Sequence, residues 1–117
     1  MRKALTLILA TSSTIALNAA HAQAAGYIAS NVTITAVSNT ANNGQHFTIR
    51  TAGGSGVCAG QKITFPLADA GTASNNQEIH NRAFALALAA MLSGKHVSVY
   101  NYADDTCSHA AYIEIFQ

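Results

Sequence analysis

The sequence lacks tryptophan, contains a single proline and carries few charged side chains among its 117 residues. Sparse charge leaves no basic patch that could neutralise several phosphates, so nucleic acid is excluded as an expected partner. It also gives no reason to expect electrostatic binding to a membrane surface. Internal repeats, long linkers and low-complexity tracts are missing as well, and the sequence therefore predicts one small domain.

Long apolar runs are absent except at the start of the chain. The cationic pair "RK" precedes the uncharged stretch "ALTLILATSSTIAL", and the small residues of "AAHAQAA" follow it. These parts in this order predict a secretory signal peptide over residues 1–22, cleaved after Ala22 or, alternatively, after Ala24. A membrane anchor would need about twenty consecutive apolar residues, which this interrupted stretch does not offer. We therefore expect an exported protein, periplasmic or secreted, with no transmembrane segment and one domain over residues 23–117.

Only two cysteines are present, Cys58 and Cys107. In an exported chain such a pair most simply forms one disulfide. The two residues enclose a loop of about 50 residues, for which loop-closure entropy would stabilise the fold by roughly 4 kcal/mol. A reactive or metal-binding thiol is less well supported, because the CxxC or adjacent-histidine arrangement of such sites is missing. The sequence predicts a structural disulfide and no cofactor.

Hydrophobic periodicity separates five strands from one helix. Period-two alternation is found at residues 31–37, 46–51, 62–67, 96–102 and 111–116, and a helical period at 77–93. The order β-β-β-α-β-β predicts a mainly β fold with one helix, and we favour a five-stranded barrel of the OB type. An open α+β sheet with a covering helix is the alternative that fits the same order. Pro66 indicates that the third strand lies at an edge of the sheet or ends there.

Local patterns predict how the helix begins, ends and packs. A capping box is expected from Ser74 with Gln77 or from Asn75 with Glu78, and Gly94 is expected to end the helix. The apolar stripe is expected to comprise Ile79, Ala83, Leu86 and Ala90, widened by Phe84, Leu88 and Met91. In the first strand, alternation predicts a buried face of Val32, Ile34 and Ala36.

No arrangement of residues predicts catalysis or metal binding. The mature histidines, His46, His80, His96 and His109, lack the His-x-x-x-His or Glu-flanked spacing of a metal helix. Ser55 lies between two glycines but without the Gly-x-Ser-x-Gly spacing of a nucleophile elbow. Asp104 and Asp105 are adjacent, which favours a solvated turn over a catalytic carboxylate pair or a calcium loop. We therefore expect no catalytic residue, no metal ligand and no enzyme activity.

Surface aromatics on the fourth strand are the strongest binding signal. Tyr100 and Tyr102 fall on the face opposite Val97 and Val99. Tyrosine rings stack on the apolar faces of sugars, and short polar side chains bond the sugar hydroxyls. The candidate ligand site is therefore Tyr100, Asn101, Tyr102, Asp104 and Asp105. The same side chains suit a contact between subunits, or ordinary packing if this face is the core.

The end of the helix resembles a known family. The alanine-rich helix, its end "SGKHVSVY" and the cysteine soon after are similar to the B subunits of bacterial A-B toxins, of the subtilase cytotoxin type. The matching positions, between residues 77 and 107, are Ala83, Phe84, Leu86, Ala87, Ala90, Gly94, Lys95, Val97, Val99 and Cys107. The resemblance implies an OB fold, a homo-pentameric ring with a separate A subunit, and glycan binding. The sugar-binding serine of that family has no assignable counterpart in Ser30 or Ser38.

The chain resembles, to the same degree, a small secreted bacterial family of unknown function that has the same order of strands and helix. The function that we expect is a secreted, non-catalytic binding module that recognises a glycan or a partner protein, in the manner of a ring-forming toxin B subunit. The alternative is a small periplasmic or secreted hydrolase or inhibitor whose site is assembled from distant residues. The ring would have a mass near five times that of one chain and would bind glycans.

Overall fold

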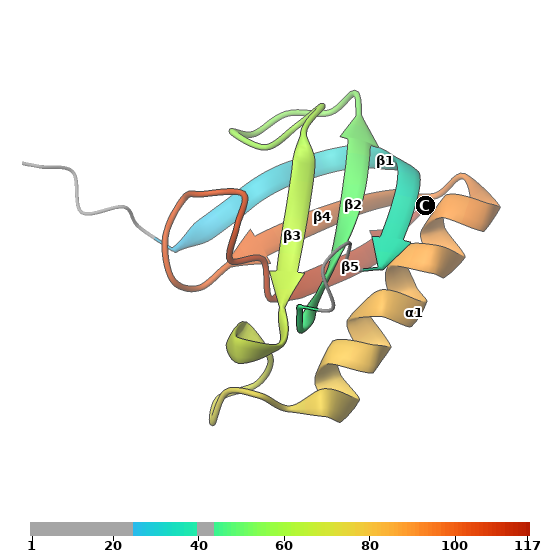
Figure 1. Cartoon of the computed structure of the whole chain (residues 1–117). Helices are drawn as coiled ribbons and strands as arrows, with labels where there is room; N and C mark the ends of the chain where they lie inside the picture. Colours follow the sequence, from blue (N-terminus) through green and yellow to red (C-terminus); the bar gives the residue numbers. More distant parts are fainter. Residues whose placement is uncertain (1–24, 40–43) are drawn as a thin grey trace, which may run out of the picture.

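The computed structural model describes residues 25–39 and 44–117, which Figure 1 shows in colour. The predicted signal peptide and its cleavage sites lie outside the described residues. The elements follow the predicted order, with bounds β1 Gly26–Asn39, β2 His46–Ala52, β3 Lys62–Pro66, a 3₁₀ turn Leu67–Asp69, α1 Gln77–Ser93, β4 His96–Asn101 and β5 Tyr112–Phe116. The predicted mainly β layout with one helix is confirmed. Pro66 is the last residue of β3, which is an edge strand, as its chemistry predicts.

All five strands form one antiparallel sheet in the order β3-β2-β1-β4-β5. The sheet is open, because no ladder joins β3 to β5 among the described residues, and so the open α+β alternative describes it better than a closed barrel. Even so, β2 and β3 run steeply across β4 and β5 in Figure 1. The amide of Thr64 donates to the carbonyl of Cys107 at 2.8 Å, and the amide of Ala110 donates to the carbonyl of Thr64 at 3.0 Å. The segment that leads into β5 therefore covers the outer edge of β3.

β1 is the central strand and begins at Gly26, well before the predicted start at residue 31. Its first half pairs with β4 and its second half with β2. Register shifts interrupt both ladders, one of them between Ile34 and Ala36. Beyond that shift Val37, and not Ala36, packs against the core. The prediction for Ala36 was wrong because a bulge adds one residue and thereby exchanges the two faces of the strand.

The helix has the predicted bounds but begins with a different cap. Asn76 is the N-cap, and its side-chain oxygen accepts a hydrogen bond from the amide of Ile79 at 3.0 Å. Ser74 and Asn75, the predicted caps, have positive φ in the turn that leads into the helix. Gly94 ends the helix with φ 66°, a left-handed conformation that glycine adopts without strain, as predicted.

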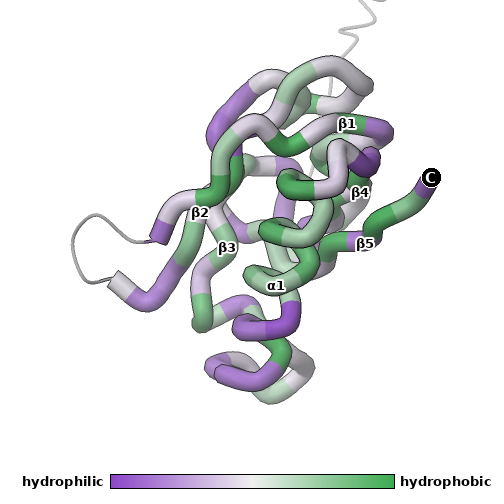
Figure 2. The backbone as a smooth tube through the Cα atoms, turned by 90° about the vertical axis from the view of Figure 1, so that its right-hand side faces the viewer, coloured by the Kyte–Doolittle hydropathy of each residue, from purple (hydrophilic) through white to green (hydrophobic). Residues whose placement is uncertain are grey.

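Small residues form the buried face of α1. Its buried side chains are Ala83, Ala87 and Ala90, which let the helix lie close to β1 and β5. Leu86 and Leu88, predicted to be part of the buried stripe, are exposed, because the face that contacts the sheet is centred near Ala87. Leu92 is 77% exposed. Figure 2 shows α1 hydrophilic at its start and hydrophobic beyond, so its C-terminal half is apolar on all sides.

The predicted disulfide between Cys58 and Cys107 is formed, with the two Cα atoms 5.7 Å apart. It joins the loop between β2 and β3 to the loop between β4 and β5. Cys58 is fully buried and belongs to the hydrophobic core. Across the described ranges, no helix combines the length and the hydropathy that crossing a membrane would require.

Candidate functional site

All four tyrosines of the chain lie together, where β1 begins and β4 ends. Tyr27 is the cross-strand partner of Tyr100 on one side, and Tyr112 is its partner on the other. The rings of Tyr27 and Tyr100 meet edge to face with their centroids 5.0 Å apart. The rings of Tyr100 and Tyr102 lie 4.7 Å apart and are tilted by 52°. We call Tyr27, Tyr100, Tyr102 and Tyr112 the tyrosine patch.

The tyrosine patch lies on the outer face of the sheet. Val97 and Val99 are fully buried, so alternation along β4 places Tyr100 on the opposite face, as the sequence predicts. Tyr102 is 66% exposed and Tyr27 is 53% exposed. Large aromatic rings that gather at a surface mark a place for contact with a ligand or a partner.

Tyr112 is oriented by a neighbour on its own strand. Its hydroxyl donates a hydrogen bond to Glu114 Oε2 at 2.9 Å. This hydrogen bond is the main cause that raises the pKa of Tyr112 above its ordinary value, and partial burial adds to it. The hydrogen bond to Glu114 orients the ring of Tyr112.

An open cavity of about 540 Å³ adjoins the tyrosine patch. Tyr102 and Tyr112 line one part of it, and Ile79 in the first turn of α1 lines another. The turn that follows the 3₁₀ segment contributes Thr72 and Ser74. A volume of this order is typical of sites for small molecules.

A carboxylate and an imidazole meet in the same cavity. His109 Nδ1 lies 2.8 Å from Asp69 Oδ2, although the two residues are 40 positions apart in the chain. Asp69 belongs to the 3₁₀ turn after β3, and His109 belongs to the segment that covers the β3 edge. The pair can hydrogen-bond a ligand hydroxyl or a water molecule.

Asn101, a predicted ligand residue, is fully buried and organises the loop after β4. Its amide nitrogen donates to Asp104 Oδ1 at 2.7 Å and to the carbonyl of Thr106 at 2.9 Å. Its amide oxygen accepts hydrogen bonds from the backbone amides of Ala103 and Asp104. Asp104 Oδ1 also accepts from the hydroxyl of Thr106 at 2.7 Å and from its amide at 2.9 Å. The side chains of Asn101 and Asp104 therefore position the loop.

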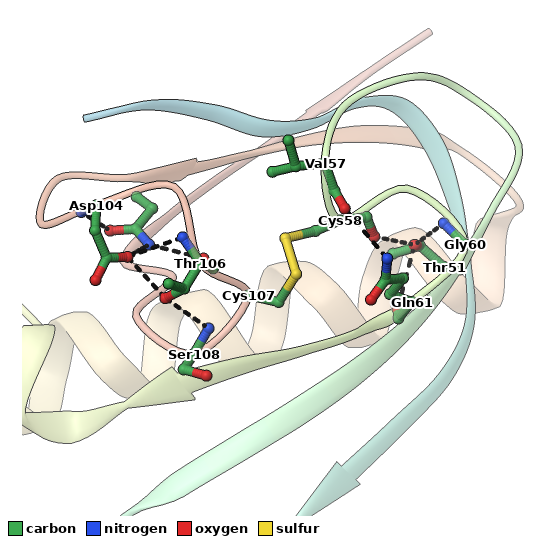
Figure 3. Close-up of a disulfide and its surroundings, with 10 residues drawn as sticks. Thr51, Val57, Cys58, Gly60, Gln61, Asp104, Thr106, Cys107 and Ser108 are labelled. Atoms are coloured by element: carbon green, nitrogen blue, oxygen red, sulfur yellow. Dashed lines mark hydrogen bonds between the residues drawn. A yellow bond between two sulfur atoms is a disulfide. The ribbon is translucent and has the colours of Figure 1, made fainter. Parts of the chain in front are cut away.

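These contacts also set the electrostatics of the loop. The hydroxyl of Thr106 is the main cause that holds the pKa of Asp104 below its ordinary value, and the backbone amide of Thr106 adds to it. Figure 3 shows this network on one side of the disulfide and the hydrogen bonds of Thr51 on the other. Asp105 is exposed in the same loop. A direct ligand contact by Asn101, Asp104 or Asp105 stays a prediction.

Sequence reasoning missed Tyr27, Tyr112 and the Asp69–His109 pair. Tyr27 precedes the predicted start of the first strand. Tyr112 falls on the outer face of the last predicted strand. Only the pairing of that strand with β4 shows that Tyr112 lies beside Tyr100. The contact between Asp69 and His109 has no signal in the sequence, because it depends on how a loop crosses the edge of β3.

Other candidate residues have different surroundings. Ser55 is paired through its backbone with Ser30 of β1, at N···O distances of 2.8 and 3.0 Å. The turn around Ser55 therefore packs against β1. Within residues 25–39 and 44–117, no three His, Cys, Asp or Glu side chains are arranged to hold a metal ion.

Comparisons with known proteins bear on the identity of the chain. Neither the curated proteins nor the solved structures include a match. A family model, described as a family of unknown function, matches residues 5–117, which is nearly the whole chain. The chain therefore belongs to DUF5992, a family of unknown function.

Proposed function

We propose that this protein is an exported, non-catalytic binding module whose tyrosine patch and adjoining cavity bind a carbohydrate. The observation that carries the proposal is the gathering of all four tyrosines, three of them exposed, beside a cavity of ligand size. Export is supported by the predicted signal peptide and by the disulfide, since disulfides persist in oxidising compartments.

The chemistry of the cavity suits a sugar. Tyr102 and Tyr112 supply rings on which the apolar C–H face of a sugar can stack. The Asp69–His109 pair, with the hydroxyls of the turn after the 3₁₀ segment, supplies hydrogen-bond partners for sugar hydroxyls. The hydrogen-bonded loop around Asn101 fixes the segment that carries Tyr102, which reduces the entropy lost on binding.

Assembly into a ring in the manner of a toxin B subunit, with a separate A subunit, belongs to the same proposal. Its support is the exposed apolar surface of α1, which includes Leu86, Leu88 and Leu92. A helix that is apolar on all sides is normally buried, and further copies of the same chain are the partner that we propose for this face.

A glycan array followed by calorimetry tests the carbohydrate proposal. We expect binding to a defined subset of glycans, and we expect Tyr102→Ala to weaken it about tenfold, since a stacked ring contributes up to about 1.5 kcal/mol. His96→Ala is the matched control, because His96 is an exposed ring on the same face of β4, at the opposite end of the strand. Absence of binding across the array, or equal losses in both variants, would refute the proposal.

A second candidate, a small hydrolase, is favoured by one observation. Asp69 orients His109 at 2.8 Å in the cavity, the arrangement in which an imidazole acts as a general base. Among the described residues no serine or cysteine is hydrogen-bonded to His109, so the imidazole would have to activate water. Hydrolysis of an activated ester that disappears in His109→Ala would support an enzyme, and rates equal to those of buffer would exclude one.

A further inference from the structure

Charge is distributed unevenly around the tyrosine patch. Of the chain's five acidic residues, Asp69 lines the cavity, Glu114 bonds Tyr112, and Asp104 and Asp105 follow Tyr102 in the loop. The cations of the described chain lie elsewhere: Arg50 and Lys62 are cross-strand partners on β2 and β3, Arg82 is on α1 and Lys95 precedes β4. None of these four cations lines the cavity. The patch thus combines aromatic rings with carboxylates that form no ion pair with the four lysines and arginines of residues 25–39 and 44–117.

We propose that the tyrosine patch and its cavity bind a ligand that carries a positively charged ammonium group, so that the sugar they select is an amino sugar with an unacetylated nitrogen. This inference rests on the proposed carbohydrate-binding function and names the ligand class of the same site.

The rings are the first part of the argument. The face of a tyrosine ring attracts a cation because its π-electrons give that face a partial negative charge. Tyr100 meets Tyr27 at an interplanar angle of 89° and Tyr102 at 52°, so the three rings present faces in different directions within a small area. Tyr102 and Tyr112 line the cavity, so their rings are the ones that a bound ammonium group would meet.

The carboxylates are the second part. Asp69 lines the cavity and is partly exposed, and its Oδ2 contacts His109, so its carboxylate can meet a ligand there. A hydrogen bond between an ammonium group and a carboxylate is stronger than one between neutral partners. The carboxylates alone do not define the site. The cavity and the rings decide which shapes fit, and the carboxylates decide which charge is favoured among them.

Titration by NMR with three probes at neutral pH separates this inference from the proposed function. The probes are methyl glucosaminide with its free, protonated amine, methyl N-acetylglucosaminide and tetramethylammonium chloride, and the readout is the shift of the tyrosine ring signals. The first two share a sugar ring and differ in charge. We expect the charged glucosaminide to bind about tenfold more tightly than the acetylated one, in line with the strength of cation–π contacts.

The possible outcomes are distinct. Equal or tighter binding of the acetylated sugar overturns the ammonium inference and leaves the carbohydrate proposal standing. Binding of tetramethylammonium with neither sugar supports the ammonium site and overturns the carbohydrate proposal. If none of the three probes shifts the tyrosine signals, both are overturned.

Matched variants test the residues. Asp69→Asn keeps an oxygen that can accept from His109 and removes only the charge. It should weaken binding of the charged sugar about tenfold more than binding of the acetylated sugar. Glu78→Gln makes the same change of charge on α1, at a residue that does not line the cavity, and should have little effect. Tyr102→Phe should retain most of the affinity and Tyr102→Leu should lose it, because the ring face is the binding element. Equal effects of Asp69→Asn and Glu78→Gln would overturn the assignment.

Discussion

Asn101 is the residue on which the loop between β4 and β5 depends. Both ends of its amide are hydrogen-bonded inside the protein, to Asp104 and to the backbone of the loop. A buried amide must be satisfied in this way, because burying an unpaired polar group costs about 1–3 kcal/mol. A polar residue beside tyrosines can therefore contribute to a binding surface indirectly, by fixing the backbone that presents the rings.

The depressed pKa of Asp104 leads to a prediction about pH. Since its pKa is lowered in the folded state, mainly by Thr106, the stabilisation is complete above the ordinary value for aspartate and is lost as pH falls through the lowered one. The loop should stay intact down to about pH 4 and loosen only below it. The amide signal of Thr106 in an NMR titration reports this change.

The controls for that titration are two neighbouring variants. Asp104→Asn should disturb the Thr106 amide at every pH, whereas Asp105→Asn, with the same change of charge, should leave the acid transition in place. An Asp104 that titrates at or above its ordinary pKa would contradict the role of the network.

The disulfide is the second feature at the residue scale. Its cysteines are 49 positions apart, so replacing both by alanine should lower the free energy of unfolding by about 4 kcal/mol through the greater entropy of the unfolded chain. Urea unfolding of the Cys58→Ala, Cys107→Ala double variant measures the loss. Any glycan affinity of the folded fraction should change little. A double variant that is as stable as the wild type but no longer binds glycans would assign the disulfide to the binding site.

At the scale of elements, the loop between β2 and β3 packs against the first half of β1. The amide of Cys58 donates to the carbonyl of Ile28 at 2.8 Å, and Ser55 pairs with Ser30. A Cβ at Gly54 would lie 2.3 Å from the carbonyl oxygen of Ser30. The run "AGGSG" is thus needed for a close approach of two backbones as well as for turning the chain.

Two adjacent glycines provide a matched test of that approach. Gly53 and Gly54 have nearly the same φ, 68° and 64°, but a Cβ at Gly53 would have no neighbour within 4 Å. Both alanine variants should carry the strain of a left-handed residue, and Gly54→Ala should cost about 2 kcal/mol more because of the clash. Equal midpoints in urea unfolding would show that the loop does not pack as described.

At the scale of the whole molecule, the helix covers one part of an open sheet and leaves leucines at the surface. The fully buried side chains of α1 are alanines, so the helix lies close to the sheet, and Leu86, Leu88 and Leu92 point outward. Leu92 is the most exposed of them. An exposed apolar surface of this kind marks a site of contact with another protein chain, and self-association is the contact that we propose.

Light scattering coupled to size exclusion tests the assembly. The proposed ring should have a mass near five times that of one chain, and Leu92→Glu should shift it toward the monomer, because a charge cannot be buried unpaired in an apolar contact. Arg82→Glu, an exposed site near the polar start of the same helix, is the control. A wild-type chain that runs as a monomer at all concentrations would refute the ring.

The sequence by itself determined the local structure of this protein. Alternation with period two, the helical period from Gln77 to Ser93 and the left-handed glycine that follows are properties of neighbouring residues. The structure confirms the elements that they predict, except for the inward face of β1 beyond its bulge. The disulfide could also be predicted from the sequence, since two cysteines allow only one intramolecular pairing.

Tertiary structure alone decided the composition of the candidate site. Pairing of β4 with β1 and β5 places Tyr27 and Tyr112 beside Tyr100, a bulge exchanges the faces of β1, and a loop across β3 joins His109 to Asp69. Each of these facts depends on the register between distant segments. A shift of one residue would move every side chain of a strand to the other face, so no local pattern could have fixed them.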